Sequence, residues 1–205
     1  WDKYPVEQVA TPEGYARDPE LVIHFYNERR KQLLDVKPNR GHELLAELEK
    51  HFNVTVITQN VDNLHERAGS THVIHLHGEL TKVCSSRDPN NPHYIKELKP
   101  EEYEVRMGDC AGDGSQLRPF IVWFGEAVPA IETAIDIVEK ADIFVIIGTS
   151  MNVYPAAGLL NYVPRTAEVY LIDPKPVDTH TSRSIHVVQK GASEGVAELK
   201  HLLGL

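Results

Sequence analysis

Two short segments place polar side chains directly after apolar, strand-like runs. The segment TQNVD at 58–62 follows the run 54–57, and HLHG at 75–78 ends a second run that begins at Val73. Histidine titrates near neutral pH and is a natural general base, while amide and carboxylate side chains bind polar ligands. These residue types favour proton transfer beside a bound polar molecule. Two alternatives are open: 58–62 is an ordinary turn in which Asp62 caps the next helix, or the two histidines bind a metal.

Two further turns suit the sugar and phosphate groups of a nucleotide. Gly148-Thr149-Ser150 follows the apolar run 142–147, and small hydroxyl-bearing turns bind ribose or phosphate oxygens through backbone N–H groups. Asp173 follows the run 168–172, where an acidic side chain holds ribose hydroxyls in many sheets of this kind. An ordinary strand-to-loop turn and a solvated aspartate are the competing interpretations.

The elements that position these segments alternate between helix and strand. Asp18-Pro19 predicts a helix start, an N-cap followed by proline, and that helix runs to about Leu34. Further helices are expected at about 41–51, 130–140 and 193–203, and strands at 54–57, 73–76, 120–124, 142–147, 168–172 and 185–188. Because 142–147 is continuously apolar, we expect it to be buried on both faces and to be the most buried strand of the chain.

This alternation favours an α/β fold with a doubly wound parallel sheet of the Rossmann-like type. Ligands of such sheets bind beyond the carboxyl ends of the strands, where the four polar segments lie. Residues 84–118 interrupt the pattern, since they are polar, contain three prolines and three glycines, and show no sustained period. We expect them to form a small inserted subdomain.

Composition and charge exclude several classes of protein. The 205 residues include 21 basic and 30 acidic ones, a net charge of −9, whereas proteins that bind nucleic-acid phosphates normally carry the opposite sign. An acidic surface suits lysine-rich protein partners. No apolar run approaches the roughly 18 residues of a membrane helix. Two cysteines cannot form a disulfide framework, so we expect a cytoplasmic protein. From the net charge and the short apolar runs, we expect neither nucleic-acid nor membrane partners.

Five segments, taken in order, resemble motifs of the sirtuins, which are NAD-dependent protein lysine deacylases. They are ATPEG at 10–14, TQNVDNLHERAG at 58–69, HLHG at 75–78, VWFGE at 122–126 and GTSMNVYP at 148–155. The resemblance covers essentially the whole chain. It implies a Rossmann-like NAD-binding domain at 1–83 and 119–205, with a helical insert at about 10–40, and a small subdomain at 84–118 derived from a zinc ribbon.

The resemblance also implies a mechanism. NAD and an acyl-lysine protein or peptide bind between the two domains, and the acyl oxygen attacks the ribose carbon that carries nicotinamide. This expels nicotinamide and leaves an alkylimidate. His77 then takes a proton from a ribose hydroxyl, which attacks the imidate carbon, and water completes the release of free lysine and 2′-O-acyl-ADP-ribose. Asn60 is implied to contact the ribose and Asp62 the nicotinamide carboxamide, so these three residues form the expected catalytic set. His75 is expected to support its strand.

Binding residues are implied on both sides of the expected cleft. Those for NAD are Gln59, Asn60, Asp62, Gly148, Thr149, Ser150, Asp173 and Ala192. The substrate backbone is implied to add as a strand between 123–126 and 151–154, a mode of binding that tolerates many sequences. The substrate-binding residues expected there are Val122, Phe124, Gly125 and Val153. We expect the protein to act as a monomer.

Tyr26 and Arg29 stand three residues apart in the predicted helix and share one face. Class III sirtuins carry a Tyr-x-x-Arg pair that binds the carboxylate of succinyl-, malonyl- or glutaryl-lysine, since arginine offers a fork of donors and tyrosine a hydroxyl. The resemblance therefore implies a desuccinylase or demalonylase with weak activity on acetyl groups. Arg30 is the alternative to Arg29, and a packed Tyr26 beside a solvated Arg29 is the structural alternative. Plain deacetylation, mono-ADP-ribosyl transfer and a catalytically silent NAD-binding module are the other functional interpretations.

The chain departs from the family pattern at its beginning. No Gly-x-Gly turn follows a predicted strand, although a dinucleotide-binding sheet uses one to approach the pyrophosphate. The family's opening Gly-Ala-Gly-x-Ser segment would lie before Trp1. We expect a longer parent chain that supplies the first strand and the phosphate loop.

The second departure concerns zinc. Many sirtuins bind structural zinc through two Cys-x-x-Cys pairs, but here Cys84 is followed by Ser-Ser-Arg and Cys110 by Ala-Gly-Asp. We interpret both cysteines as remnants of such a site and expect no zinc. His93, Asp109 and Asp113 are possible substitutes, but they lack the paired spacing.

Overall fold

The structure is a computed structural model, and it describes residues 4–149, 151, 155–179 and 181–205. The chain divides into two compact units. Unit 1 comprises Trp1–Lys37, Thr58–Asn63 and His75–Pro129, and unit 2 comprises Pro38–Ile57, Leu64–Ile74 and Ala130–Leu205. The expected domain division, with 84–118 as a separate subdomain, stays a prediction.

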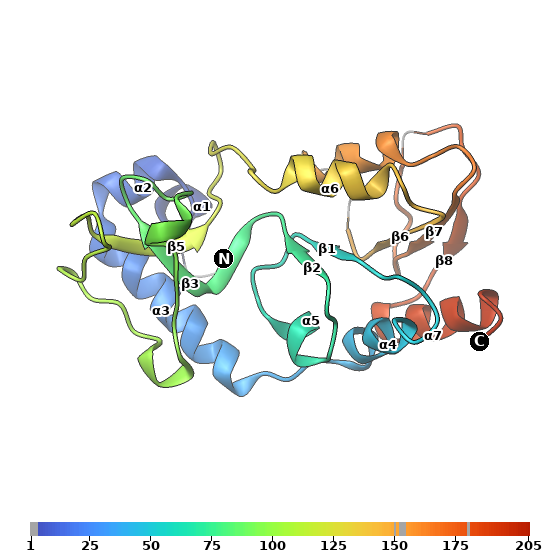
Figure 1. Cartoon of the computed structure of the whole chain (residues 1–205), viewed down its shortest axis with the longest axis horizontal. Coiled ribbons are helices and arrows are strands. Elements are labelled where there is room, and N and C mark those ends of the chain that lie inside the picture. Colours follow the sequence, from blue (N-terminus) through green and yellow to red (C-terminus); the bar gives the residue numbers. More distant parts are fainter. Residues whose placement is uncertain (1–3, 150, 152–154, 180) are drawn as a thin grey trace. The chain divides into compact units, whose positions relative to one another are not determined.

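Unit 1 begins with three helices (Figure 1). They are α1 Val6–Val9, α2 Pro12–Arg17 and α3 Pro19–Asp35. Asp18 caps α3, because its carboxylate accepts a hydrogen bond from the backbone N–H of Leu21 at 3.0 Å, and Pro19 occupies the first turn. The helix start predicted at Asp18-Pro19 is confirmed.

A three-stranded antiparallel sheet completes unit 1, in the order β4-β3-β5. The strands are β3 Gly78–Ser85, β4 Lys96–Glu97 and β5 Leu117–Ile121, and the short 3-10 helices η1 Pro92–Tyr94 and η2 Pro100–Glu102 flank β4. Sequence reasoning missed β3 and β4, because lysine and glutamate side chains interrupt their apolar pattern. The predicted strand 120–124 was placed too late, since β5 ends at Ile121 and the chain turns after it.

The interior of unit 1 lies between α3 and this sheet. Ile23 from α3, Val83 from β3 and Val105 are buried together, and Tyr15 and Leu117 pack against them. Asn27 adds polar bonds to the same layer: its side-chain N–H donates to the carbonyl of Val105, and its side-chain oxygen accepts from the N–H of Val105. The residues of α3 are thereby held in a defined position on the sheet.

Unit 2 contains a parallel sheet in the order β6-β7-β8, as the alternating pattern predicted. Its strands are β6 Ile143–Ile147, β7 Glu168–Ile172 and β8 His186–Val188. The most buried of the three is β7, the central strand, whose last four residues are all buried. The prediction that 142–147 is the most buried strand was wrong, because β6 pairs on one side with β7 and is mostly half-buried.

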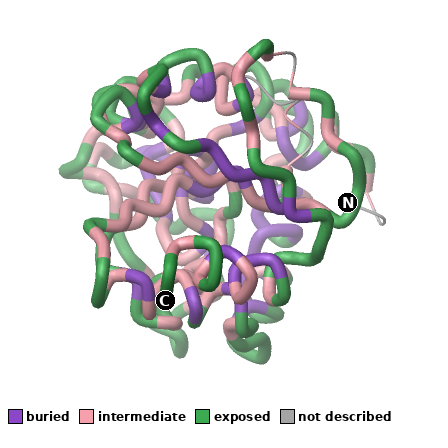
Figure 2. Tube along the Cα trace, turned by 90° about the vertical axis from the view of Figure 1, so that its right-hand side faces the viewer, coloured by how far each residue is buried: buried purple, intermediate pink, exposed green. Residues whose placement is uncertain are grey.

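Helices precede and follow these strands in sequence, and η3 lies between β6 and β7. They are α4 Arg40–Leu48, α6 Ile131–Val138, the 3-10 helix η3 Ala156–Tyr162 and α7 Ala192–Leu202. Leu48 of α4 and Val196 of α7 meet Ile172 of β7 in one core, and Figure 2 marks the buried residues in purple. The helix α7 lies so close to β7 that a Cβ at Gly195 would come within 2.1 Å of the Ile172 side chain. The predicted helices and parallel strands of this unit are confirmed, with ends shifted by a few residues.

A two-stranded sheet of β1 Val56–Thr58 and β2 Val73–His75 precedes the two candidate segments, and α5 Leu64–Arg67 lies between them in sequence. These strands fall within a residue or two of the runs expected at 54–57 and 73–76. Among the helices that the structure describes, none combines the length and the apolar character needed to cross a membrane.

Candidate functional site

His75 and His77 both direct their imidazole rings at the turn that follows β1. Nδ1 of His77 lies 3.2 Å from the carbonyl oxygen of Gln59, and Nδ1 of His75 lies 3.1 Å from that of Asn60. A carbonyl oxygen only accepts hydrogen bonds, so each Nδ1 carries the hydrogen and each neutral ring keeps its lone pair on Nε2. His77 therefore offers Nε2 as a base, which is the chemistry expected of it from the sequence.

Hydrogen bonds hold the turn 58–62 at both of its ends. The Thr58 hydroxyl is buried and accepts from the N–H of Asn60 at 3.0 Å, while the Thr58 carbonyl accepts from Leu76 N–H at 2.9 Å. At the far end, the carbonyl of Val61 accepts from the N–H of Leu80 at 2.7 Å. The segment is thus an ordered turn tied to the chain around His77, and Gln59, Asn60 and Asp62 lie within it.

Gly78 makes a backbone crossing possible immediately after His77. Its φ angle is +83°, and a Cβ atom built there would lie 2.1 Å from the carbonyl oxygen of Phe120. A side chain is excluded on both counts, since L residues avoid this φ region and the β5 backbone fills the space. The chain therefore needs glycine at this position, where it passes close to the backbone of β5.

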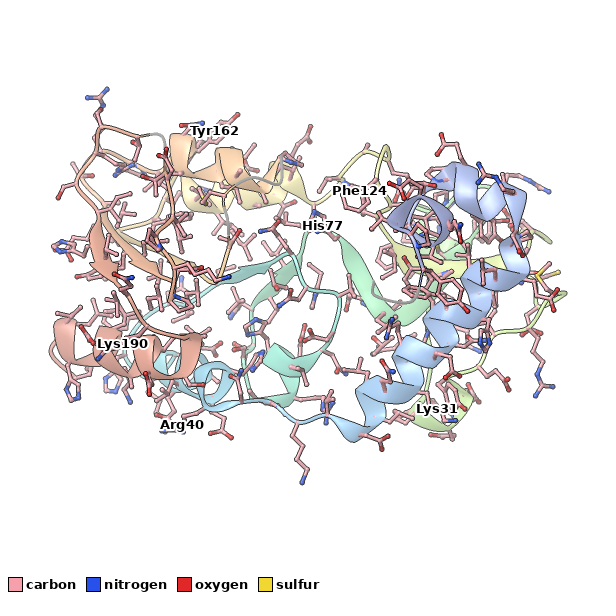
Figure 3. The ribbon with its side chains drawn as sticks, turned by 180° about the vertical axis from the view of Figure 1, so that it is seen from behind. Lys31, Arg40, His77, Phe124, Tyr162 and Lys190 are labelled. Carbon is pink, nitrogen blue, oxygen red and sulfur yellow. The ribbon has the colours of Figure 1, made fainter. Side chains whose placement is uncertain are left out.

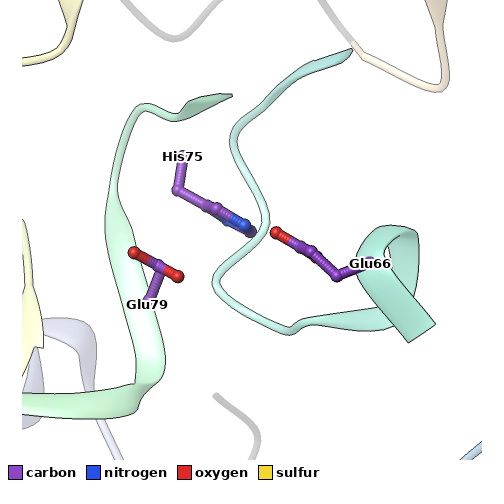
Figure 4. Close-up of side chains that lie close together, drawn as sticks. All are labelled: Glu66, His75 and Glu79. Carbon is purple, nitrogen blue, oxygen red and sulfur yellow. The ribbon is translucent and has the colours of Figure 1, made fainter. Parts of the chain in front are cut away.

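The surroundings of His75 bear on whether the two histidines could bind a metal together. The ligand atoms of His75 and Glu79 lie within 4.8 Å of each other, and Figure 4 shows these side chains. Glu79 also forms an ion pair of 2.7 Å with Lys82 in β3. Of the potential metal-binding groups in the described part of the chain, none contains both His75 and His77. The structure therefore gives no support to metal binding by the pair.

The segment 122–126 follows β5 as a turn. Val122 donates its N–H to the His77 carbonyl at 2.9 Å, which ties this segment to the candidate base. The Phe124 N–H donates to Ala10, and its side chain is 59% exposed, while Gly125 has a φ of +91°. The Trp123 N–H donates to the Glu126 carboxylate, so the backbone N–H groups of Val122, Trp123 and Phe124 all have acceptors. A substrate strand beside 122–125 would therefore pair mainly with the carbonyl oxygens of this segment.

Tyr26 lies in the interior of unit 1. Its side chain is 4% exposed, its ring meets that of Phe25 edge-on at 5.1 Å, and its hydroxyl oxygen lies 3.0 Å from Nε1 of Trp123. Burial raises the pKa of Tyr26 to about 12, so the hydroxyl keeps its hydrogen at neutral pH.

Arg29 and Arg30 differ sharply in their surroundings. Arg29 is half-buried, its guanidinium lies 4.7 Å above the Phe25 ring, and its Nη1 donates to the side chain of Gln32 at 2.8 Å. Arg30 is 3% exposed and donates to the carbonyls of Leu80 and Tyr103 and to the Asn27 side chain. Burial lowers the pKa of Arg30 to about 10. These bonds fix Nε and Nη1 of Arg30, and its buried Nη2 has no partner among the described residues.

In unit 2, the nucleotide-binding candidates gather at the carboxyl edge of the parallel sheet. Gly148 follows β6, and its N–H donates to the carbonyl oxygen of Ile172 at 2.9 Å. Asp173 follows β7, and its N–H donates to the carbonyl oxygen of Val188 at 3.3 Å. A Cβ at Gly148 would meet no described atom within 4 Å. Ala192 is the first residue of α7, whose N-cap is Gly191. Such an edge fits the adenosine half of NAD.

Two details complete this edge. The Thr149 hydroxyl accepts from the N–H of Met151 at 3.4 Å, and a carboxylate oxygen of Asp173 accepts from Lys175 N–H at 2.8 Å. In the described part of the chain, the other carboxylate oxygen of Asp173 accepts no hydrogen bond. The predicted residues Ser150 and Val153 lie outside the described residues.

The cysteine positions do not provide a zinc-binding set. The Cys84 thiol is fully buried, lies 3.7 Å from the Pro119 carbonyl, and has its pKa raised to about 12 by burial, whereas Cys110 is exposed. Asp113 accepts hydrogen bonds from the hydroxyls of Ser85 and Ser115, each at 2.7 Å. A buried, protonated thiol and a carboxylate occupied by hydroxyls do not fit tetrahedral zinc. The absence of zinc stays a prediction, which these contacts support.

Sequence reasoning missed the role of Arg118 and Glu126. They form an ion pair whose N–O distances are 2.7 and 3.0 Å, and Arg118 is 5% exposed. One signal was present in the sequence, because an arginine inside the apolar strand LRPFI requires a buried partner. The Arg118 guanidinium lies over the Trp123 ring, and Nε1 of Trp123 donates to the Tyr26 hydroxyl. Trp123 thereby links the turn 122–126 to Tyr26.

Comparison with known proteins gives one consistent result. Residues 1–155 match the model of the Sir2 family. A protein of Bacteroides thetaiotaomicron named NAD-dependent protein deacylase is 88% identical over 203 residues, which is 99% of this chain and 87% of that protein. A Helicobacter pylori (strain 26695) protein of the same name is 47% identical, covering 97% of this chain and 84% of that protein.

Solved structures agree with these relatives. A mutant Sir2 homologue in complex with ADP ribose superposes with a TM-score of 0.85 at 35% identity, covering 100% of this chain and 84% of that one. A structure described as Sir2-p53 peptide-NAD+ superposes with a TM-score of 0.75 at 30% identity, covering 93% of this chain and 80% of that one.

Proposed function

The chain belongs to the Sir2 family and is an NAD-dependent protein deacylase, and from this premise we propose that it removes acidic acyl groups from lysine side chains of proteins. The groups are succinyl, malonyl and glutaryl, with acetyl a weaker substrate. The co-substrate NAD supplies the ribose that receives the acyl group. The products are free lysine, nicotinamide and 2′-O-acyl-ADP-ribose.

The contrast between Arg29 and Arg30 carries this proposal. Nε and Nη1 of Arg30 donate to Leu80, Asn27 and Tyr103, and its buried Nη2 has no partner among the described residues. Arg29 is half-buried, lies over the Phe25 ring and, among the described residues, donates only to the side chain of Gln32. Arg29 is therefore the arginine that can exchange its partner for a ligand carboxylate. Its position one helical turn from Tyr26 brings a cation and a hydroxyl to the same face of α3.

His77 serves in this proposal as the general base. The hydrogen bond from Nδ1 to the Gln59 carbonyl orients the ring and leaves Nε2 to take a proton from a ribose hydroxyl. Asn60 and Asp62 hold the ribose and the nicotinamide carboxamide, and Gln59 belongs to the same wall. Gly148, Thr149, Asp173 and Ala192 hold the adenosine half.

The peptide substrate binds beside 122–125 in this proposal. Support comes from the exposed Phe124 side chain, the open backbone of Gly125 and the bond from Val122 to His77. Acyl-lysine proteins are the partners. Monomeric action, cytoplasmic location and the domain boundaries at 83–84 and 118–119 stay predictions.

A matched pair of charge deletions on α3 tests the acyl preference. Arg29→Met should lower kcat/KM for a succinyl-lysine peptide about 10- to 100-fold and change that for the matched acetyl peptide little, since a hydrogen bond to a charged group contributes about 1.5–3 kcal/mol. The control is Lys31→Met, which removes an exposed charge from the same helix (Figure 3). An equal effect of both substitutions would contradict the proposal, because it would reflect net charge.

A further inference from the structure

The Tyr26 hydroxyl has a fixed direction. Nε1 of Trp123 lies 3.0 Å from its oxygen, and an indole N–H can only donate, so the phenol oxygen is the acceptor. The hydrogen of the phenol must then point away from Trp123. Among the residues that the structure describes, no acceptor receives this hydrogen. A buried hydroxyl hydrogen in that state is stabilised by any ligand oxygen that reaches it.

Trp123 is itself held on its ring and on its backbone. The guanidinium carbon of Arg118 lies 3.6 Å from the indole ring, and both nitrogens of that fork bind the carboxylate of Glu126. The same carboxylate accepts from the backbone N–H of Trp123 at 2.8 Å. Arg118 also donates to the Ile121 carbonyl at 2.8 Å, which ties the group to the end of β5. Such two-pronged ion pairs have a specific geometry, so the indole has little freedom to turn.

We propose that Trp123 is a positioning residue for acyl-group selection, which directs the Tyr26 hydroxyl hydrogen toward the carboxylate of an acidic acyl group. Arg118 and Glu126 hold Trp123 in the orientation that this requires. The inference rests on the proposed function, because the oxygen that accepts this hydrogen in the proposal belongs to the carboxylate of an acidic acyl group. An acetyl group has no carboxylate, so its turnover does not depend on the direction of the hydroxyl.

The test measures the ratio of kcat/KM for succinyl and acetyl peptides of the same sequence. Trp123→Phe removes the N–H and keeps an aromatic ring, and we expect the ratio to fall on the order of 10-fold, mainly through the KM of the succinyl peptide. Because Trp123 is fully buried, a second variant carries β-(3-benzothienyl)alanine at this position, which keeps the bicyclic shape and lacks only the N–H. It should give the same fall.

Tyr15 provides the matched control. Its ring also packs on Trp123, at 5.3 Å between centroids, but Trp123 Nε1 donates to Tyr26. Tyr15→Phe should leave the ratio within about 2-fold of the wild-type value, well below the effect of a lost hydrogen bond. A double-mutant cycle adds a second readout: in a Tyr26→Phe background, the substitution of Trp123 should lower the ratio no further, since it acts through that hydroxyl.

The outcomes separate this inference from the proposed function. If Arg29→Met and Tyr26→Phe remove the succinyl preference and both Trp123 variants keep it, the positioning role is wrong and the proposed function stands. If both Trp123 variants weaken the two peptides equally, Trp123 acts on the turn alone and the inference is again wrong. A wild-type protein without succinyl preference would overturn both.

Discussion

Nδ1 of His77 lies 3.2 Å from the carbonyl oxygen of Gln59, and the ring of His75 binds the next carbonyl in the chain, that of Asn60. Two histidines two residues apart are thus oriented by consecutive peptide groups of one turn. Each Nδ1 is a donor, and each ring has the same tautomer when neutral. The pair therefore offers a matched comparison between His77, the proposed base, and His75, the proposed supporting histidine.

Replacing His77 tests its role as the base. His77→Gln should lower kcat about 10²- to 10⁴-fold for succinyl and acetyl peptides alike, which is the usual contribution of general acid–base catalysis. His75→Gln removes the neighbouring imidazole in the same way and should lower kcat far less. Steady-state kinetics on both variants measures this, with thermal unfolding as the check on folding. Equal losses in the two variants would show that the turn needs both rings for its structure.

Gly78→Ala should destabilise the protein by about 2–4 kcal/mol, because it combines a φ of +83° with a Cβ atom 2.1 Å from the Phe120 carbonyl. Gly108 also has a positive φ, +97°, but a Cβ there would meet no atom of the described residues within 4 Å. Gly108→Ala should therefore cost only about 1 kcal/mol. Urea unfolding of both variants measures the difference, and similar losses would mean that the close crossing at Gly78 is relaxed in solution.

Arg30→Met and Arg29→Met should have opposite consequences. Removing Arg30 leaves the carbonyls of Leu80 and Tyr103 and the Asn27 side chain without their donor, so the free energy of unfolding should fall by about 2–4 kcal/mol. The ratio of succinyl to acetyl turnover should persist in the folded fraction. Arg29→Met should lose the ratio and keep its stability. The reverse pattern, measured by denaturation and peptide kinetics, would identify Arg30 as the residue that binds the acyl carboxylate.

Asp113 should make stability depend on acid pH. Hydrogen bonds from Ser85 and then Ser115 lower the pKa of its carboxyl from 3.8 to about 2. A carboxyl with a lower pKa in the folded state adds stability above its unfolded pKa, and this contribution is lost as the pH falls from about 4 to about 2. Across this pH window, Asp113→Asn should therefore lose less stability than the wild-type protein. The control is Asp136→Asn, which changes an exposed aspartate. Identical pH profiles for wild type and Asp113→Asn would contradict the hydrogen-bonded carboxylate.

The sheet and helices of unit 2 were predictable because local patterns determine them. The 3-10 helix η3 separates β6 from β7 in sequence, α7 follows β8, and α7 buries one face through Gly195, Val196 and Leu199. Burial was less predictable: the run 142–147 is more apolar than 168–172, yet β7 is central and β6 has a single partner strand among those described. Hydrophobicity shows which residues prefer the interior, but the order of strands decides which of them reach it.

The candidate site shows the same division. The types and spacing of His75 and His77 were sufficient to suggest a base, whereas the ring orientation depends on carbonyls 18 and 15 positions away in sequence. The choice between Arg29 and Arg30 was open in the sequence, because a basic run hides which side chain points inward. The bond between Trp123 and Tyr26 spans 97 positions, and no local pattern signals it.

The ratio of kcat/KM for succinyl- and acetyl-lysine peptides of identical sequence tests the central claim most directly. It is measured on the wild-type protein with saturating NAD, following nicotinamide and the deacylated peptide by mass spectrometry. The carboxylate contacts assigned to Arg29 and Tyr26 predict a ratio of at least about 10, the value of one charge-assisted hydrogen bond. A ratio at or below unity would contradict acidic acyl specificity and leave a plain deacetylase.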